Sequence, residues 1–506
     1  MKLKGNLKFY LPFIILFFTV FPLRLASSFS LEGRVKEFTL QNGIKVLLLE
    51  RRQAPTLSLY IRFRVGAVDE NLGMTGTAHL LEHLLFKGTK TLGTKDYAAE
   101  EKILKRIDSV GMALDAEKAK GAKADQEFIK YLEKTLQELT KEHRQLIIKD
   151  EIELIYSQNG AVGFNAMTSV DTTTYVVNLP ANRLELWARI ESDRILNPVL
   201  REFYSERDVV MEERRRSYDS PPQRKLVEHF LATAFLAHPY GRPIIGWASD
   251  IQFLDKQRTE QFFRTYYSPE NMVITIVGDL SPELTISLLK KYFERIPRKV
   301  LPPPLPTREP EQLGERRLKI MADAQPELII GFHKPNPPHA DDLVCEVISG
   351  LLSYGRTSRF YQKLVEEKKI AVDISTSSSF PGVRYPNLFV IFATPRHPHT
   401  PEELEKAIYQ ELEELATTPV PEKELKKIQN QIQADYLRQL SSNSKLAYWL
   451  SYYQCLLGDW RFLTQRLKDY EKVTPDDVRR VVRQYFQERN RTVGVLIRSG
   501  AKKEEK

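Results

Sequence analysis

The chain has 506 residues, of which 42% are hydrophobic and 28% are charged, and its formal net charge is +9. This length exceeds what a single hydrophobic core supports, so two or more domains of ordinary globular composition are expected. Four of the positive charges lie in the first 24 residues, and the remaining excess is too small and too dispersed to indicate a nucleic-acid partner.

Residues 1–28 have the pattern of a secretory signal peptide. Lysines precede the apolar run Phe9–Leu23, and Ala26-Ser27-Ser28 offers small residues for cleavage after Ser28. The run contains two prolines and is shorter than the roughly 20 apolar residues that cross a bilayer. The segment predicts a periplasmic or secreted protein with no integral membrane span after cleavage, and an uncleaved anchor is the alternative.

The first half alternates strands and helices. Asn42-Gly43 separates two alternating segments and predicts a β-hairpin over 35–50. A strand at 57–65 and the loop 66–76 lead to a helix that ends between Phe86 and Gly88. The same patterns predict strands over 161–179 and 272–277 and helices over 184–197, 202–218 and 282–295.

Residues 97–158 differ in composition from their surroundings. The segment is dense in charge, and Phe128, Leu132, Leu136 and Leu139 recur at helical spacing. We expect an inserted helical hairpin that turns near Gly121. Such a segment is more often a packed projection than a binding site.

Residues 297–310 are rich in proline and predict a semi-rigid linker between two domains, 35–296 and 311–500. The second half repeats the pattern, with strands expected at 328–333, 371–379 and 387–394 and helices at 342–352, 401–416, 422–440 and 444–457. Residues 266–274 are echoed at 485–493, each following a helix and leading into a strand. The expected fold is α+β, with two homologous α/β-sandwich domains in which helices pack on a largely antiparallel sheet.

The two cysteines, Cys345 and Cys455, lie in apolar, helical stretches of the second half. An oxidising compartment would allow them to pair, but two buried thiols are the favoured interpretation. Their positions do not indicate metal ligands.

The stretch His79-Leu80-Leu81-Glu82-His83 carries the clearest chemical signal. Histidines four apart share one face of a helix and can reach one metal ion, and Glu82 lies close to that face. The order His-x-x-Glu-His is an inverted zinc-peptidase signature. The alternative is a helix with two solvated or core histidines.

A catalytic zinc site needs three protein ligands and an open position, so a third ligand must come from elsewhere. Glu206 and Glu213 are seven residues apart on a predicted helix and share a face. One could bind zinc while the other hydrogen-bonds a ligand histidine. Without the histidines, this Glu/Arg-rich helix would be read as a solvated, ion-paired surface. With Zn²⁺ bound, Glu82 would act as general base in peptide hydrolysis.

Three stretches resemble the pitrilysin/insulinase family of zinc peptidases, and within it the bacterial processing-peptidase-like group: His79–His83, Asn165–Ser169 and Glu206–Arg214. The resemblance implies that His79, His83 and Glu213 bind zinc, that Glu82 is the catalytic base and that Glu206 orients a ligand histidine. It also implies that the strand at Asn165 and Ala166 pairs with the backbone of a peptide or unfolded-protein substrate.

Two features depart from the family pattern. His83 and Glu213 are 130 positions apart, more than is usual, and the inserted hairpin accounts for the excess. Family members often carry in the second half an Arg and, seven residues later, a Tyr that help to bind substrate, and here those positions are Val365 and Val372. We therefore expect a heterodimer in which a related zinc-less subunit supplies the Arg and Tyr, unless the nearby Arg356 and Tyr361 replace them.

Two alternatives to an endopeptidase are a catalytically silent scaffold or assembly subunit and a non-peptidase zinc hydrolase. The intact set of His79, Glu82, His83 and Glu213 argues against the silent scaffold, since a scaffold has no physical need for it.

Overall fold

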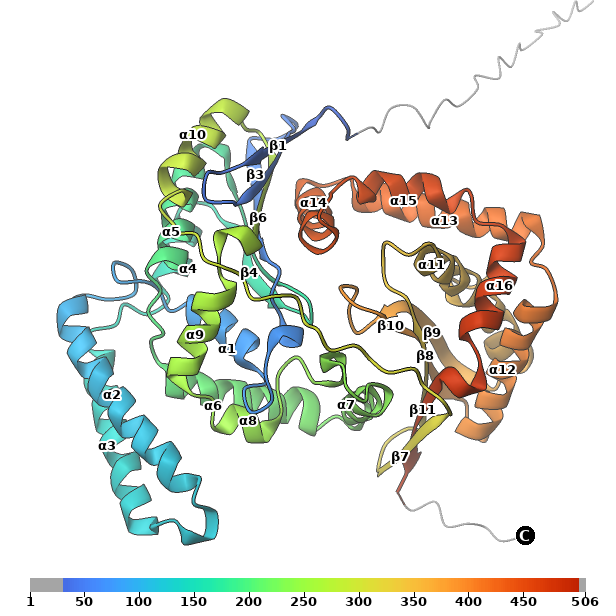
Figure 1. The fold of residues 1–506 in the computed structure, drawn as a ribbon, viewed down its shortest axis with the longest axis horizontal. Helices are drawn as coiled ribbons and strands as arrows, with labels where there is room; N and C mark the ends of the chain where they lie inside the picture. The colour runs from blue at the N-terminus through green and yellow to red at the C-terminus, as the bar shows by residue number, and fades with distance from the viewer. Residues whose placement is uncertain (1–30, 500–506) are drawn as a thin grey trace, which may run out of the picture.

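The computed structural model describes residues 31–499, which form two mixed α/β halves facing each other (Figure 1). The predicted signal peptide, residues 1–28, lies outside the described residues. Within 31–499, none of the helices has the length and apolar character needed to cross a membrane.

The first half is built on a six-stranded sheet. Its strands are β1 (Val35–Thr39), β2 (Lys45–Glu50), β3 (Thr56–Phe63), β4 (Val162–Thr168), β5 (Thr173–Pro180) and β6 (Met272–Gly278). They lie in the order β1-β2-β6-β3-β5-β4, and all neighbours are antiparallel except β2 and β6. The predicted hairpin is confirmed, with Val35 opposite Leu49. Strand β4 is left at one edge of the sheet.

The second half is built on a five-stranded sheet of β7 (Arg316–Ala322), β8 (Glu327–Lys334), β9 (Ala371–Phe380), β10 (Asn387–Pro395) and β11 (Arg491–Arg498). The order β7-β11-β8-β10-β9 reproduces β2-β6-β3-β5-β4 strand for strand, with one parallel pair, β7 and β11, in the equivalent place. The expected fold class of two homologous halves is confirmed.

The echo between 266–274 and 485–493 has a structural counterpart. The side-chain amide of Asn271 donates to the backbone oxygens of Tyr266 and Arg64, at 2.9 and 3.1 Å. Asn490 donates in the same way to the oxygens of Tyr485 and His333, at 2.7 and 2.8 Å. In both halves one asparagine therefore fixes the end of a helix against the strand beside which the chain re-enters the sheet.

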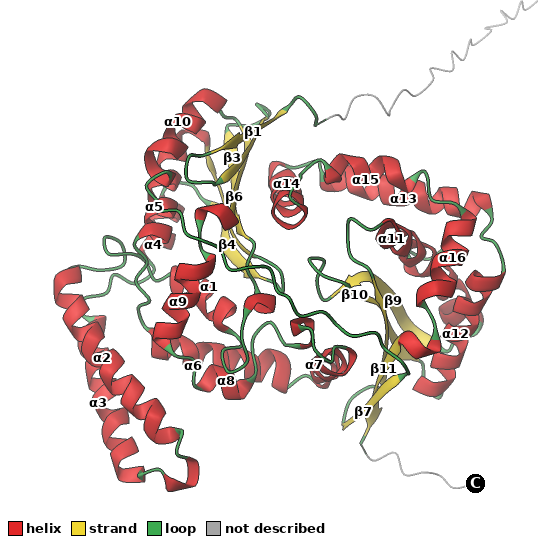
Figure 2. Ribbon diagram, in the orientation of Figure 1, coloured by secondary structure: helices red, strands yellow, loops and turns green. Residues whose placement is uncertain are grey.

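Helices cover the sheets of both halves (Figure 2). Those of the first half are α1 (Thr77–Leu85), α4 (Glu151–Gln158), α5 (Leu184–Leu196), α6 (Phe203–Arg214), α7 (Pro222–Ala234), α8 (Ala248–Gln252), α9 (Lys256–Tyr266) and α10 (Pro282–Phe293). Those of the second half are α11 (Ala340–Ser353), α12 (Pro401–Thr417), α13 (Glu422–Gln439), α14 (Asn443–Leu457), α15 (Phe462–Tyr470) and α16 (Pro475–Tyr485). Helices α7, α8 and α15 and strand β7 were not expected from the sequence patterns.

The two halves exchange one helix each. Helix α7 of the first half packs on the second sheet, where Leu226 and Phe230 join a core with Ile329. Helix α14 of the second half packs on the first sheet, where Leu446 and Leu450 meet β2, β3 and β6. The residues 297–310 between the halves form no helix or strand, and the domain boundaries placed there stay a prediction.

Both cysteines are buried free thiols, as favoured from the sequence. Burial raises the pKa of Cys345 to about 12 and that of Cys455 to about 11, so neither is a ready thiolate at neutral pH.

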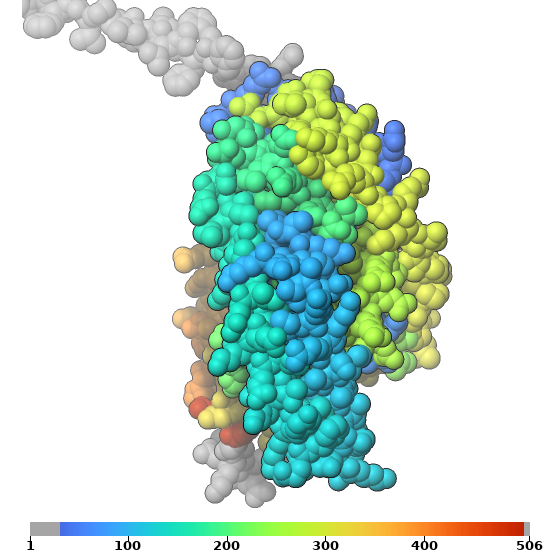
Figure 3. Space-filling model, turned by 90° about the vertical axis from the view of Figure 1, so that its left-hand side faces the viewer, coloured from blue at the N-terminus to red at the C-terminus, as the bar shows by residue number. Residues whose placement is uncertain are grey.

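The inserted hairpin consists of α2 (Tyr97–Lys118) and α3 (Gln126–Arg144), which turn at a short 3-10 helix, Gly121–Lys123. The two helices form the lower part of the face turned to the viewer in Figure 3. Leu114, Ile129 and Leu132 make a small core between them. The hairpin is shorter than the predicted 97–158 segment, because 151–158 forms the separate helix α4, which packs into the first core through buried residues.

The hairpin is anchored on the outer side of α6. The guanidinium of Arg207 on α6 donates to both carboxylate oxygens of Asp115, at 2.6 and 2.8 Å. Gly111 lies against the ring of Tyr204, since a Cβ placed on it would be 2.1 Å from the ring carbon Cζ. These contacts make the hairpin a packed projection and not a loose appendage.

At the base of the hairpin, Glu100 forms a buried ion pair. Its carboxylate accepts from Arg201 at 2.6 and 2.9 Å and contacts Nε2 of His143 at 2.8 Å. Burial pushes the pKa of Glu100 upward, but the hydrogen bonds from His143 and Arg201 outweigh it and lower the pKa from 4.5 to about 2. The folded state therefore favours the charged form of Glu100.

Replacing Glu100 by glutamine is expected to lower the free energy of unfolding at pH 7 by about 3–5 kcal/mol, because Arg201 is left buried without its charge partner. Since the pKa of Glu100 is lower in the folded state, its contribution is complete above about pH 4.5 and is lost as the pH falls toward 2. Urea unfolding followed by circular dichroism at pH 7 and pH 3 measures both effects. The exposed neighbour Glu101→Gln is the matched control, and equal stability of the two variants at pH 7 would contradict the expectation.

Candidate metal centre

The His79–His83 motif lies on α1, whose N-terminus is fixed by the buried carboxylate of Glu70. Glu70 accepts from the backbone N–H groups of Gly76 and Ala78, at 2.9 and 2.7 Å. Gly76 has φ of 94° and lies against the backbone oxygen of Ile245, 2.5 Å from where a Cβ would stand, so only glycine fits. The start of the helix is therefore held in place two residues before its first histidine.

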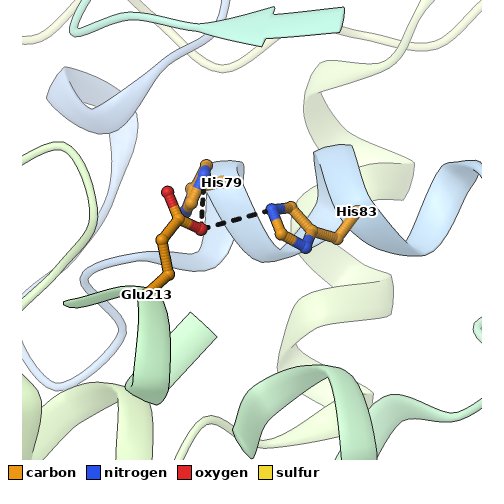
Figure 4. A group of neighbouring side chains, drawn as sticks. All are labelled: His79, His83 and Glu213. Atoms are coloured by element: carbon orange, nitrogen blue, oxygen red, sulfur yellow. Dashed lines mark ion pairs between the residues drawn. The ribbon is translucent and has the colours of Figure 1, made fainter. Parts of the chain in front are cut away.

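The leucines of α1 turn the motif outward from the core. Leu80, Leu81, Leu84 and Leu85 are fully buried, whereas His79, Glu82 and His83 are half-buried on the opposite face. Glu213, near the end of α6, meets this face (Figure 4). Its Oε2 lies 3.7 Å from Nε2 of His79 and 3.6 Å from Nε2 of His83.

These three side chains fit a zinc ion. Their ligand atoms all lie within 4.8 Å of one another, and no other group of three His, Cys, Asp or Glu side chains in the described part of the chain is so close. Three ligands about 2.0–2.2 Å from one tetrahedral zinc would be roughly 3.4 Å apart, close to the observed spacing. Burial and the neighbouring His83 lower the pKa of His79 to about 4, which keeps its imidazole in the neutral form that binds metal.

Glu206 on α6 contacts both His83 and Lys87. Its Oε2 is 3.5 Å from Nδ1 of His83, and its Oε1 is 2.6 Å from Nζ of Lys87. The hydrogen bond to Glu206 raises the pKa of His83, although burial opposes it. Because Glu206 occupies Nδ1, the other ring nitrogen of His83 faces Glu213. Lys87, which holds Glu206, was not identified from the sequence.

Glu82 is oriented by the first sheet and not by the three-residue group. The hydroxyl of Thr168, at the end of β4, donates to Oε2 of Glu82 at 2.6 Å. Burial raises the pKa of Glu82.

Strand β4 has a neighbour on one side alone within the described sheet, and on it Asn165 is exposed whereas Ala166 is buried. The structure thus brings an open strand edge beside the motif helix, and Thr168 is a second residue that sequence reasoning missed.

Residues 191–194, near the end of α5, bind the loop after α1 and a strand of the first sheet. Asp193 accepts from the hydroxyl of Thr91 at 2.8 Å in the loop after α1. Arg194 pairs with Glu191 and lies over the ring of Tyr175 at 4.5 Å. This segment supports the surroundings of α1 and does not enter the three-residue group.

The second half contains a helix pair equivalent to α1 and α6, but among its described residues there are no counterparts of the group His79, His83 and Glu213. By topology α11 and α13 correspond to α1 and α6, and they pack directly, with Gly350 so close to Ile428 that a Cβ would lie 2.6 Å from its methyl carbon. Val365 is buried in the second core, and Val372 is half-exposed on β9, the edge strand of that sheet. Among the described residues no hydrogen bond joins Arg356 or Tyr361 to the motif helix.

Comparison with protein families matches both halves. The model described as "Insulinase (Peptidase family M16)" matches residues 45–143 and 130–247, and the two stretches meet within the inserted hairpin. The model described as "Peptidase M16 inactive domain" matches residues 254–432.

Individual relatives and a solved structure support the same family. Zinc protease PqqE of Helicobacter pylori is 28% identical over 469 residues, covering 90% of this chain and 91% of the relative. The uncharacterized zinc protease YmxG of Bacillus subtilis is 22% identical over 459 residues, covering 90% of this chain and 96% of the relative. The crystal structure of a protease from Helicobacter pylori superposes with a TM-score of 0.76 at 26% identity, covering 92% of this chain and 99% of that one. The model matches span most of the chain, and the protein belongs to the insulinase family of zinc proteases, peptidase family M16.

Proposed function

We propose that this protein is a zinc-dependent endopeptidase that hydrolyses peptides or unfolded polypeptides. The observation that supports the proposal most strongly is the convergence of His79, His83 and Glu213 at the spacing of zinc ligands, although His83 and Glu213 are 130 positions apart in the sequence. The names of its relatives support the same class of enzyme.

His79, His83 and Glu213 would hold the ion, and Glu206 would orient His83. When bound, zinc supplies a Lewis acid that polarises the scissile carbonyl and acidifies water. Glu82 then acts as general base, taking a proton from water and delivering it to the leaving amine. Thr168 holds Oε2 of Glu82, so Oε1 is the oxygen assigned to proton transfer. Burial of Glu82 raises its pKa and makes it a stronger base.

The edge of β4 is the proposed substrate-binding strand. An extended peptide added beside Asn165 and Ala166 would continue the first sheet through main-chain hydrogen bonds. Such bonds depend little on side chains, so the proposed substrates are unfolded segments of varied sequence. The N-terminal pattern of 1–28 supports a periplasmic or secreted location.

We also propose a heterodimer with a zinc-less member of the family. Val365 and Val372 stand where the resemblance places the substrate-binding Arg and Tyr, and Val365 is an apolar residue buried in the second core. The partner would supply the Arg and Tyr.

A catalytically silent scaffold is the second candidate. The match of 254–432 to an M16 inactive domain favours it for the second half, but the first half keeps the complete set of chemical groups. The two candidates predict different behaviour with zinc and substrate.

The deciding experiment measures zinc content and cleavage of a quenched fluorescent peptide, for the purified chain alone and for the chain co-purified with partners from its source. Cleavage that is lost with a chelator and restored by Zn²⁺ is the expected result. Absence of cleavage with every partner would favour the scaffold, and hydrolysis of esters alone would indicate a non-peptidase hydrolase. Full activity of the isolated chain would refute the heterodimer.

A further inference from the structure

A loop of the second half packs into the first half against Asp171, Tyr240 and Asp69. Residues 381–385 lie in the connection from β9 to β10. Gly382 is packed so closely that a Cβ would be 2.5 Å from Oδ2 of Asp171 and 2.7 Å from the hydroxyl of Tyr240. The backbone N–H groups of Val383 and Arg384 donate to the same Asp171 oxygen, at 2.7 and 3.2 Å. The loop is thus bonded to the first half through its backbone.

The side chain of Arg384 makes a second connection. Its Nη1 donates to both carboxylate oxygens of Asp69, at 2.9 and 3.0 Å, and both side chains are less than 10% exposed. Asp69 ends the short 3-10 helix Ala67–Asp69 and also accepts from the N–H of Gly66 at 3.1 Å. Burial raises the pKa of Asp69, and the charge of Arg384 opposes that rise. Arg384 therefore neutralises a carboxylate that has been removed from water.

Both connections end next to groups that orient the metal centre. Asp69 precedes Glu70, whose carboxylate binds the N–H groups of Gly76 and Ala78 at the start of α1. Asp171 follows Thr168 by three residues, and Thr168 holds Glu82. The loop 381–385 therefore fixes the two segments from which the ligand helix and the general base take their positions.

We infer that Arg384 of the second half is a positioning residue for the metal centre of the first half, acting through Asp69 and Glu70 on the N-terminus of α1. The inference rests on the proposed function, since it concerns the zinc site assigned there. The second half would then help to position the proposed zinc ligands, because the spacing of His79, His83 and Glu213 depends on where α1 begins.

The test is zinc affinity of the metal-free full-length chain, measured by competition with a chromophoric chelator. Arg384→Gln is expected to weaken zinc binding about 10-fold, the lower end of the effect of groups that support metal ligands, and to lower kcat with little change in KM. Arg384→Lys, which keeps the positive charge on a differently shaped side chain, is expected to lose less. The matched control is Arg466→Gln, which removes a similarly buried arginine that pairs with Asp342 and Glu346 inside the second half, and its zinc affinity should equal that of the wild type.

A double-mutant cycle with Asp69→Asn separates positioning from general loosening. If Arg384 acts through Asp69, its replacement weakens zinc binding little further in the Asp69→Asn background. Wild-type zinc affinity in folded Arg384→Gln, or an equal loss in both backgrounds, would overturn the inference and leave the proposed function intact. Absence of zinc binding by the wild type would refute the proposed function itself and this inference with it. If Arg384→Gln does not fold, as judged by thermal unfolding, Arg384→Lys carries the same comparison.

Discussion

Replacing Glu82 by glutamine is expected to lower peptide hydrolysis by about 10²–10⁴-fold while the protein still binds zinc. Glu82 shares α1 with His79 and His83, but its carboxylate bonds to Thr168 and is not one of the three ligand groups. Glutamine has the same shape and can still accept from Thr168, yet its amide cannot take a proton from water. Chemistry should therefore be lost without loss of the metal.

The measurement combines kcat for a quenched peptide, assayed with the partner if one is required, with zinc content of the same preparation. The matched control is Glu212→Gln, since Glu212 is exposed on α6 and pairs with Arg215. Unchanged activity in Glu82→Gln would refute Glu82 as the general base. Loss of zinc together with activity would show that Glu82 is needed for the metal site instead.

The second large effect is expected for Glu213→Gln. This change should weaken zinc binding by more than about 100-fold, the upper end of the loss seen when a residue that only supports a metal ligand is replaced. Its Oε2 lies 3.6–3.7 Å from both histidine nitrogens, so glutamine would replace an anionic oxygen ligand by a neutral one and lose its attraction to the cation. Activity should fall in parallel at low zinc concentration and recover partly when zinc is in excess.

Glu212→Gln serves again as the control, because it makes the same chemical change one residue earlier on a different face of α6. Competition with a chelator measures both affinities. Equal affinity in wild type and Glu213→Gln would remove Glu213 from the ligand set. An equal loss in both variants would point to a general disturbance of α6.

The features that were predictable from the sequence are those with local signals. Two histidines four apart define a helix face whatever surrounds them, and Asn42-Gly43 defines a hairpin turn by itself. Helical periodicity predicts that Glu206 and Glu213 lie on the same face of α6, and the structure places both beside α1. The repeated chain order was suggested by one short echo, which proved to contain equivalent asparagines.

The groups that support the site gave no such signal. Lys87 and Glu70 are ordinary residues in the sequence, and Thr168 lies in the Asn165–Ser169 stretch without a role of its own being evident. Their roles arise from contacts made when β4, α6 and the start of α1 come together. Strand β7 was not expected because it lies at an edge and is polar, with Arg316, Arg317 and Lys319 interrupting its apolar residues.

The exchange of α7 and α14 between the halves has the form of a domain-swapped dimer whose two copies have been joined into one chain. Each half has a core of its own residues, but the second face of each sheet is covered by a helix that belongs to the other half. The two shared clusters join the halves independently of the linker, so we expect the halves to stay associated after a break in the Pro-rich linker. On this view the proposed zinc site in one half and the loop of the other half that packs beside it belong to a single folded unit.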